Sequence, residues 1–216
     1  MIEVNDRYYK RDFWVDENLK YERPHFRMEK AARLANRIAS GKPCDLLDVG
    51  CGPATLQGLL HPNIHYYGID IAIQEPESNL IEMDFVEEPI KFQDRRFDII
   101  VTQGVFEYIG KVQRQKLSEI HDLLSADGTF IATYVNFDHW NRNIYQPYNN
   151  VQSFSDFYGS LKEFFCVDRH FPTSHRWYHD EPHGRVMWAL QKHINLNVPI
   201  ISRLFGVEYF FICSAK

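Results

Sequence analysis

The chain has 216 residues, of which 44% are apolar and 25% are charged, and its formal net charge is −5. These values are typical of one globular domain and argue against a mainly nucleic-acid-binding surface, because such domains are usually basic. No window approaches the about 18 uninterrupted apolar residues of a membrane span, the first residues lack the apolar core of a signal peptide, and the 4 cysteines have no C-x-x-C spacing. We therefore expect a cytoplasmic protein without a membrane or nucleic-acid partner.

The first half of the chain predicts helices and strands in alternation. Apolar side chains recur with a helical period over residues 22–40, and Gly41 is a stop signal. Pro53 marks the first turn of a further helix, a position that proline tolerates. Apolar, β-branched runs predict strands at residues 44–49, 63–71, 79–85 and 96–103.

The second half continues this alternation. Amphipathic patterns predict helices at residues 112–128 and 153–165, the latter capped by Ser153 or Ser155. Strands are predicted at residues 129–135, 166–171 and 207–215. Strands that alternate with helices at this spacing indicate a parallel sheet covered on both faces.

Two segments, 136–150 and 172–206, are rich in aromatic residues, His and Asn. The first follows a strand directly, and ligands of open α/β sheets bind outside the carboxyl ends of strands. Such long loops are often lids or substrate walls, although a packed surface loop would have the same composition. His175, His179 and His183 recur every four residues, but Pro182 interrupts a helix through them. We therefore expect polar substrate recognition here and no metal site.

The turn after the first strand, LLDVGCGPATL, differs from a dinucleotide fingerprint. Gly50 and Gly52 match the G-x-G-x-x-G/A pattern, but Thr55 stands at the third small position. Asp48 lies just before the turn, where a carboxylate repels a phosphate and attracts an amine. The turn therefore favours a cationic nucleoside ligand over NAD.

Two more acidic residues follow strands. Asp70 lies 22 residues after Asp48, where a carboxylate can bind both ribose hydroxyls, or else cap a helix. Asp84 can accept a hydrogen bond from an adenine amino group, with Met83 and Phe85 against the ring, or can be an ordinary loop carboxylate.

Five segments, LLDVGCGPATL, YYGID, EMDF, FDIIVTQGVFEYI and LLSADGTFIATYVN, resemble in order the motifs of class I S-adenosylmethionine-dependent methyltransferases. The resemblance implies a Rossmann-like α/β fold with a seven-stranded, mostly parallel sheet of order 3-2-1-4-5-7-6, strand 7 antiparallel, and S-adenosyl-L-methionine as cofactor. The cofactor-binding residues it implies are Asp48, Gly50 and Gly52 for the methionine part, Asp70 with Ile71 for the ribose, Asp84 with Phe85 for the adenine, and Gln103 and Gly104 through their backbone.

The chain departs from the family pattern at three places. Ala54 replaces a common third glycine, and Tyr108 stands where many small-molecule enzymes have the His of a Leu-Glu-His triplet. The second change puts an acid–base role at that position in doubt. The long segment 172–206 separates the last two strands, and we interpret it as an insertion.

We expect one methyltransferase domain over residues 1–216, with an N-terminal helical lid (1–41), a cofactor-binding half (42–136) and a substrate-side half (137–216) that holds the insertion. The expected reaction is in-line methyl transfer to an O or N atom of a small polar or aromatic metabolite. His139 is the candidate general base, unless it is structural, and the candidate substrate-binding residues are Tyr108, Tyr134, Trp140, Trp177 and His179.

Aromatic side chains near the N-terminus, such as Tyr8 and Trp14, can fold over the cofactor, because aromatic faces attract a sulfonium cation; ordinary helix packing is the alternative. Other functions that the sequence leaves open are a protein or tRNA methyltransferase, an NAD-dependent oxidoreductase and a non-catalytic cofactor-binding subunit. The sequence TQGVFE after the fourth strand lacks the [NDS]-P-P-[YFW] motif of many amino-methylating enzymes, which argues against a nucleic-acid substrate.

Overall fold

Seven strands form a single sheet of order β3-β2-β1-β4-β5-β7-β6, in which β7 is antiparallel to both neighbours. The computed structural model describes residues 6–75, 77–92, 95–141, 153–175 and 193–216. The predicted strand order and the antiparallel last strand are confirmed. The strands are β1 Cys44–Val49, β2 Ile64–Asp70, β3 Leu80–Glu82, β4 Phe97–Thr102, β5 Leu124–Val135, β6 Phe165–Pro172 and β7 Glu208–Ala215.

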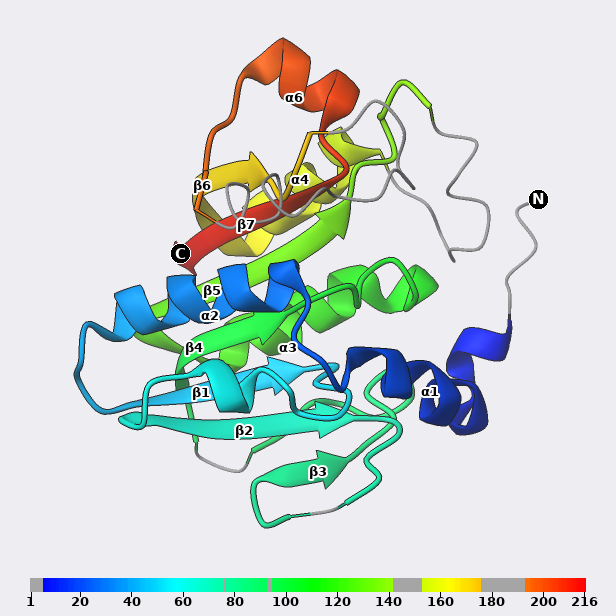
Figure 1. Ribbon diagram of the computed structural model, residues 1–216, viewed down its shortest axis with the longest axis vertical. Coiled ribbons are helices and arrows are strands. Elements are labelled where there is room, and N and C mark those ends of the chain that lie inside the picture. Colours follow the sequence, from blue (N-terminus) through cyan, green and yellow to red (C-terminus); the bar gives the residue numbers. More distant parts are fainter. Residues whose placement is uncertain (1–5, 76, 93–94, 142–152, 176–192) are drawn as a thin grey trace.

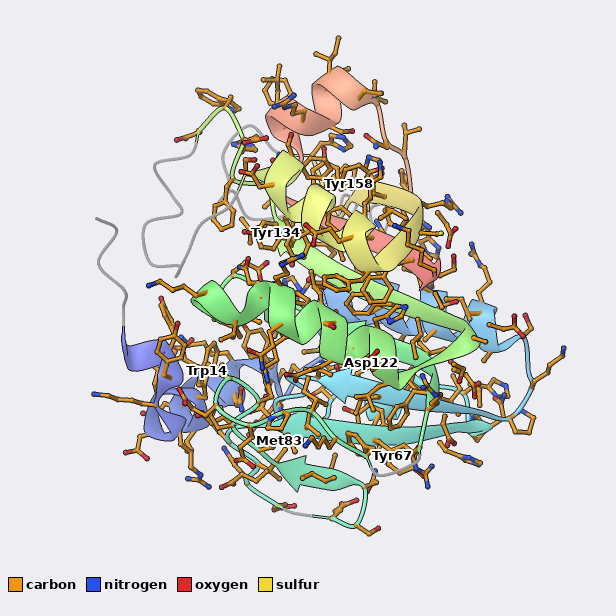
Figure 2. The ribbon with its side chains drawn as sticks, turned by 180° about the vertical axis from the view of Figure 1, so that it is seen from behind. Trp14, Tyr67, Met83, Asp122, Tyr134 and Tyr158 are labelled. Carbon is orange, nitrogen blue, oxygen red and sulfur yellow. The ribbon has the colours of Figure 1, made fainter. Side chains whose placement is uncertain are left out.

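Helices cover both faces of this sheet, as predicted (Figure 1). Helix α2 lies on one face, and α3 and α4 lie on the other, which Figure 2 shows from behind. The helices are α1 Arg11–Asn18, α2 Phe26–Ala39, α3 Gln113–Leu123, α4 Phe154–Phe164 and α6 Pro199–Phe205. Short 3-10 turns occur at η1 Asp6–Tyr9, η2 Leu19–Tyr21, η3 Gln57–Leu59 and η4 Gly110–Val112. None of the helices in these described ranges is long and apolar enough to cross a membrane.

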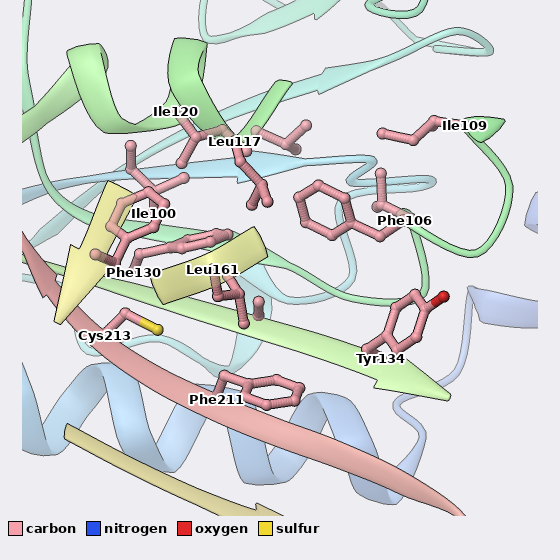
Figure 3. Packing of buried hydrophobic residues seen from close by; sticks show 14 of the residues in the cluster. Ile100, Phe106, Ile109, Leu117, Ile120, Phe130, Tyr134, Leu161, Phe211 and Cys213 are labelled. Atoms are coloured by element: carbon pink, nitrogen blue, oxygen red, sulfur yellow. The ribbon is translucent and has the colours of Figure 1, made fainter. Parts of the chain in front are cut away.

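Alternate residues of each central strand supply two hydrophobic cores. In β5, Phe130 points into the core under α3 and α4, which also contains Leu117 and Leu161 (Figure 3). Its neighbour Ile131 belongs to the core under α2, together with Ala35. Because both faces are covered, these strands are apolar almost throughout, as parallel strands usually are.

Two predicted helices are wrong in part. Residues after Pro53 form turns and the short η3 instead of a helix, because Ala54 has a left-handed φ of 55°, which breaks a right-handed helix at once. The helix predicted for 112–128 ends at Leu123, because Leu124 is already extended and pairs with Phe97 of β4. The remaining predicted elements are present within a few residues of their expected ends, and Ser153 is the cap of α4.

Candidate functional site

A pocket of about 890 Å³, its open mouth included, lies where β1, β2 and β4 end. The sheet forms its floor, and the N-terminal segment that contains α1 forms one wall. All nine residues that the sequence analysis named for the cofactor line this pocket: Asp48, Gly50, Gly52, Asp70, Ile71, Asp84, Phe85, Gln103 and Gly104. Tyr108, predicted to contact the substrate, lines it as well. Parallel strands that end at one edge thus bring together residues that lie up to 60 positions apart.

The glycine turn packs tightly against the loop that follows β4. Gly50 has a φ of +74°, and a Cβ on it would lie 2.5 Å from a methyl carbon of Val105. Its N–H donates to the carbonyl of Ile69 in β2, at 2.8 Å. Only glycine combines this backbone conformation with so close an approach, so the bare backbone becomes part of the pocket wall.

Asp48 lies beneath the turn and is buried. Its Oδ2 accepts a hydrogen bond from the hydroxyl of Tyr66 at 2.9 Å. The pKa of Asp48 is raised to about 7, mainly by burial and to a smaller extent by the nearby carboxylate of Asp70, while the hydrogen bond from Tyr66 opposes the shift. A neutral pH therefore lies close to the titration of this carboxyl group.

Asp70 ends β2 and organises the neighbouring backbone. Its Oδ2 accepts from the N–H of Gly52 and its Oδ1 from the N–H of Ala72, both at 2.9 Å. The side-chain amide of Asn18, at the end of α1, also donates to Oδ1 at 3.4 Å. Burial raises the pKa of Asp70, and these hydrogen bonds oppose the shift. Through Asn18, the N-terminal segment touches the central carboxylate of the pocket.

Asp84 lies beyond β3, at the side of the pocket formed by Phe85 and Val86. Its Oδ1 accepts from the N–H groups of Val86 at 3.0 Å and Glu87 at 3.4 Å. These bonds fix the carboxylate beside the buried ring of Phe85. A carboxylate held next to an aromatic face fits a flat, amine-bearing ring.

Gln103 and Gly104 follow β4 at the opposite side of the pocket. The N–H of Gly104 donates to Oγ1 of Thr133 at 2.9 Å, so this backbone donor is already engaged, and the predicted backbone contact stays a prediction for the remaining backbone groups. The Oε1 atom of Gln103 is buried and has no hydrogen-bond donor in the described part of the structure. Gln103 thus contributes to the pocket lining a buried acceptor for which the described residues supply no donor.

Arg27, in the first turn of α2, is the one Lys or Arg side chain among the described residues that line the pocket. Its guanidinium donates to Oε1 of Glu208 in β7 at 2.8 Å, and it lies against Gly104. Its Nε is buried, with no acceptor among the described atoms. A buried, unpaired N–H is costly, and a ligand anion would satisfy it.

Three aromatic side chains close the pocket on the side of the N-terminal segment. The ring centroid of Tyr108 lies 4.9 Å from that of Tyr8 and 5.0 Å from that of Trp14. The indole N–H of Trp14, which Figure 2 labels, donates to the Tyr8 carbonyl at 2.8 Å. These contacts join the N-terminal segment to the loop after β4.

Glu107 is the buried neighbour of Tyr108. Its Oε1 accepts from the N–H of Val135 at 2.8 Å, and its Oε2 has no donor in the described part. Burial, and secondarily the charge of Glu208, raises the pKa of Glu107 to about 8. Sequence analysis did not single out this residue.

The other predicted site residues lie elsewhere. His139 is fully buried, its Nδ1 accepts from the N–H of Asn141 at 3.1 Å, and it does not line the pocket. Tyr134 stacks on Phe157 inside the core below α4, with 3.9 Å between the two ring centroids. Trp140 is 43% exposed and lies outside the pocket. The structure therefore does not bring these three residues to the predicted site. Trp177 and His179 lie outside the described residues.

Arg27 and Asn18 are the main pocket residues that sequence analysis missed. Neither belongs to a motif, and an arginine in the first turns of an amphipathic helix ordinarily faces water. Their positions depend on how the N-terminal segment docks on the sheet, since Arg27 and its partner Glu208 are 181 residues apart. No local pattern carries that information.

Comparisons with known proteins agree with this geometry. A family model described as a methyltransferase domain matches residues 21–191. No curated protein matches the sequence. Solved structures that resemble the chain include a TehB-like SAM-dependent methyltransferase from Corynebacterium glutamicum, with 20% identity, 87% of this chain and 88% of that chain covered, and a TM-score of 0.57. Another is an S-adenosylmethionine-dependent methyltransferase from Clostridium acetobutylicum, with 11% identity, coverages of 94% and 96%, and a TM-score of 0.63.

A third is the plantazolicin methyltransferase BpumL in complex with a triazolic desmethylPZN analog and SAH, with 16% identity, coverages of 100% and 95%, and a TM-score of 0.64. At these identities the likeness is one of fold. The enzymes that share it include users of the cofactor that the sequence predicts.

Proposed function

Because the chain belongs to the methyltransferase-domain family, we propose that it transfers a methyl group from S-adenosylmethionine to an O or N atom of a small polar or aromatic metabolite. The observation that carries this proposal is the set of polar atoms in the pocket at the strand ends. Two of them, Nε of Arg27 and Oε1 of Gln103, are buried and have no hydrogen-bond partner among the described residues. One is a donor for a carboxylate and the other an acceptor for an ammonium group, which are the two ends of an amino acid.

The remaining groups fit the nucleoside part of the same ligand. We assign Asp70 to two ribose hydroxyls, whose binding would displace the weak hydrogen bond from Asn18; its position in the pocket lining supports this role. We assign Asp84 to the adenine amino group, with Phe85 against the ring, because both line the same side of the pocket. Asp48 and Asp70 give the centre of the pocket a negative potential, which favours a cation and opposes a pyrophosphate.

A bound S-adenosylmethionine supplies an electrophilic methyl group on a cationic sulfur. The chain's own contribution is to hold this ligand and an acceptor in line and to exclude water. The aromatic wall of Tyr8, Trp14 and Tyr108 serves the second purpose, and its ring faces favour a nearby cation. His139 is no part of this proposal, since it does not line the pocket. Alignment and desolvation therefore carry the catalysis that we propose.

Calorimetric titration of the full chain with S-adenosylhomocysteine, S-adenosylmethionine and NAD tests the cofactor. We expect binding of the two sulfur nucleosides and none of NAD. Asp70→Ala should weaken binding by roughly 1–3 kcal/mol, the usual loss for charge-assisted hydrogen bonds. Tight binding of NAD without a response to either sulfur nucleoside would refute the proposal.

Arg27→Lys tests the carboxylate contact separately. Lysine keeps the positive charge beside Glu208 but has no Nε–H in that position, so we expect weaker binding of both sulfur nucleosides with little loss of folding stability. Arg37→Lys, in the last turn of the same helix and away from the pocket, is the matched control. Equal affinities for the two variants would remove Arg27 from the cofactor site.

The acceptor is the finer part of the proposal. The acidic overall charge supports a small metabolite over tRNA, because tRNA-binding surfaces are usually basic. A radiolabelled methyl-transfer screen with pooled small metabolites, bulk tRNA and a protein extract distinguishes the classes. Label in tRNA or protein alone would overturn the small-molecule assignment and leave the cofactor assignment intact.

A further inference from the structure

Apolar side chains are concentrated on one exposed part of the surface. Seven of the ten large apolar side chains that are exposed in the described structure lie around α6 and the segment before it. We name this group the apolar ridge; it consists of Trp140, Ile194, Leu196, Val198, Ile200, Ile201 and Leu204. Ile200 is 77% exposed, and α6 lies at the edge of the molecule opposite β3 (Figure 1). Patches of clustered apolar side chains usually mark interaction sites.

The segment before α6, residues 194–198, exposes its apolar side chains and partly buries its polar ones. Ile194, Leu196 and Val198 are exposed, whereas Asn195 and Asn197 between them are half-buried. The amide of Asn197 donates to the carbonyl of His170 at 3.3 Å. An extended segment that faces solvent usually shows the reverse alternation, with its polar side chains exposed and its apolar ones buried. This alternation therefore favours an apolar medium on the outer side.

Hydrogen bonds hold the ridge in this orientation. Oγ of Ser202, which is buried in α6, accepts from the N–H of Val198 at 2.8 Å and lies 2.9 Å from Nε2 of His175. The buried ammonium group of Lys30 donates to the carbonyl of Ile194 at 2.7 Å. The N–H of Trp140 donates to the carbonyl of Leu204 at 3.1 Å and so places Trp140 at the border of the ridge. The exposed side chains thus stand on an anchored backbone.

The charge of the sequence around the ridge differs from that of the whole chain. No Asp or Glu occurs between Glu181 and Glu208, although the chain has 29 of them, and the same stretch contains Arg185, Lys192 and Arg203. Arg203 lies 3.4 Å from Asp138, and its side chain remains 63% exposed. Exposed apolar side chains beside an exposed cation such as Arg203, with a tryptophan at the border, are typical of elements that lie in a membrane interface.

We propose that the apolar ridge binds the surface of an anionic lipid membrane, with Ile200 and Ile201 inserted below the headgroups and Arg203 near them. Apart from Trp140, the residues of the ridge lie beyond residue 191, where the match to the family model ends. The proposal is independent of methyl transfer and departs from the expectation of no membrane partner, which rested on the lack of a spanning segment. A second copy of the chain is the alternative occupant, and the sedimentation measurement below distinguishes it from a membrane.

Flotation of the full chain with phosphatidylcholine vesicles, with and without an equimolar share of phosphatidylglycerol, tests the proposal. We expect binding to the anionic vesicles, weakened by salt. The double variant Ile200→Asp, Ile201→Asp should bind at least roughly tenfold less, because two isoleucines no longer enter the interface. The matched control is Ile38→Asp, Ile81→Asp, which alters two exposed isoleucines elsewhere and should bind like the wild type.

Affinity for S-adenosylhomocysteine serves as the folding control for both double variants. Absence of binding to anionic vesicles, or equal binding by the two double variants, would overturn the proposal. Equal binding to neutral and anionic vesicles would overturn the role of charge. A wild-type dimer in sedimentation analysis that the ridge variant alone converts to a monomer, without vesicle binding, would assign the ridge to a second copy instead.

Discussion

Glu107 gives the most direct test of the energetics of the site. It is fully buried, it accepts one hydrogen bond, from Val135, and burial raises its pKa to about 8. In an unfolded chain a glutamate has a pKa of about 4.3. Between these values the folded protein keeps a proton that the unfolded chain releases. The contribution of Glu107 to the free energy of unfolding is therefore fully present below the unfolded pKa, and it is lost as the pH rises through the folded pKa.

The expected size follows from the linkage of one proton. Where only the folded state holds this proton, the free energy of unfolding falls by at most about 1.4 kcal/mol for each unit by which the pH rises. Glu107→Gln removes this dependence, because glutamine has no proton to lose and keeps an oxygen for the N–H of Val135. Asp48, with its pKa raised to about 7, also lowers the free energy of unfolding as the pH rises, but it does so mainly below pH 7. Burial lowers the pKa of Lys30 to about 8, and its titration opposes this loss of stability as the pH rises. The difference between the wild type and Glu107→Gln over pH 7 to 8 therefore reports on Glu107.

Urea unfolding followed by tryptophan fluorescence, at pH 7 and pH 8, measures the effect. We expect the wild type to lose stability over this interval and Glu107→Gln to lose clearly less. Glu87→Gln, at an exposed position, is the control and should follow the wild type. Parallel losses in all three proteins would show that Glu107 is ionised in the folded state and would refute the reasoning.

Two further predictions concern Gly50 and His139. Gly50→Ala should lower the free energy of unfolding by roughly 1–3 kcal/mol, because its φ is +74° and the new methyl group would meet Val105; urea unfolding measures this, and unchanged stability would contradict the geometry. His139→Ala should leave turnover at saturating substrates within about twofold of wild type, since general base catalysis contributes on the order of 10²-fold or more where it operates. A far larger loss of turnover, with an ionisation missing from the pH–rate profile, would instead support the base role predicted from the sequence.

The residues at the strand ends could be predicted because their positions follow from local patterns. An apolar run that ends in an aspartate, as at Asp48 and Asp70, indicates both the strand and the edge to which the side chain belongs. Once the strands are parallel, one edge collects all of these residues. The prediction of nine pocket residues therefore rested on this strand-end pattern together with the family resemblance, and the topology confirms the strand order.

Side-chain positions that depend on tertiary contacts could not be predicted from local sequence patterns. His139 follows β5 at the right edge, but Asn136 donates to the carbonyls of Arg203 and Gly206 at 2.8 and 2.7 Å, and the turn it anchors carries the imidazole into the interior. The residue type and chain position of His139 suit a general base. The direction of its side chain, however, depends on contacts with α6, some 65 residues away in sequence. Arg27 is the converse case, a residue that only the docking of α2 brings to the pocket.

The charge balance of the pocket explains which nucleotide it suits. Asp48 and Asp70 both have raised pKa values, because burial removes water from them and no lining cation near them compensates. Arg27, the one Lys or Arg among the described lining residues, already pairs with Glu208. A phosphate bound here would add negative charge to carboxylates that are already destabilised. A ligand with a positive charge would offset the same penalty and favour the ionised form of both carboxyl groups. The buried acids therefore select for cationic charge before any single hydrogen bond to the ligand is considered.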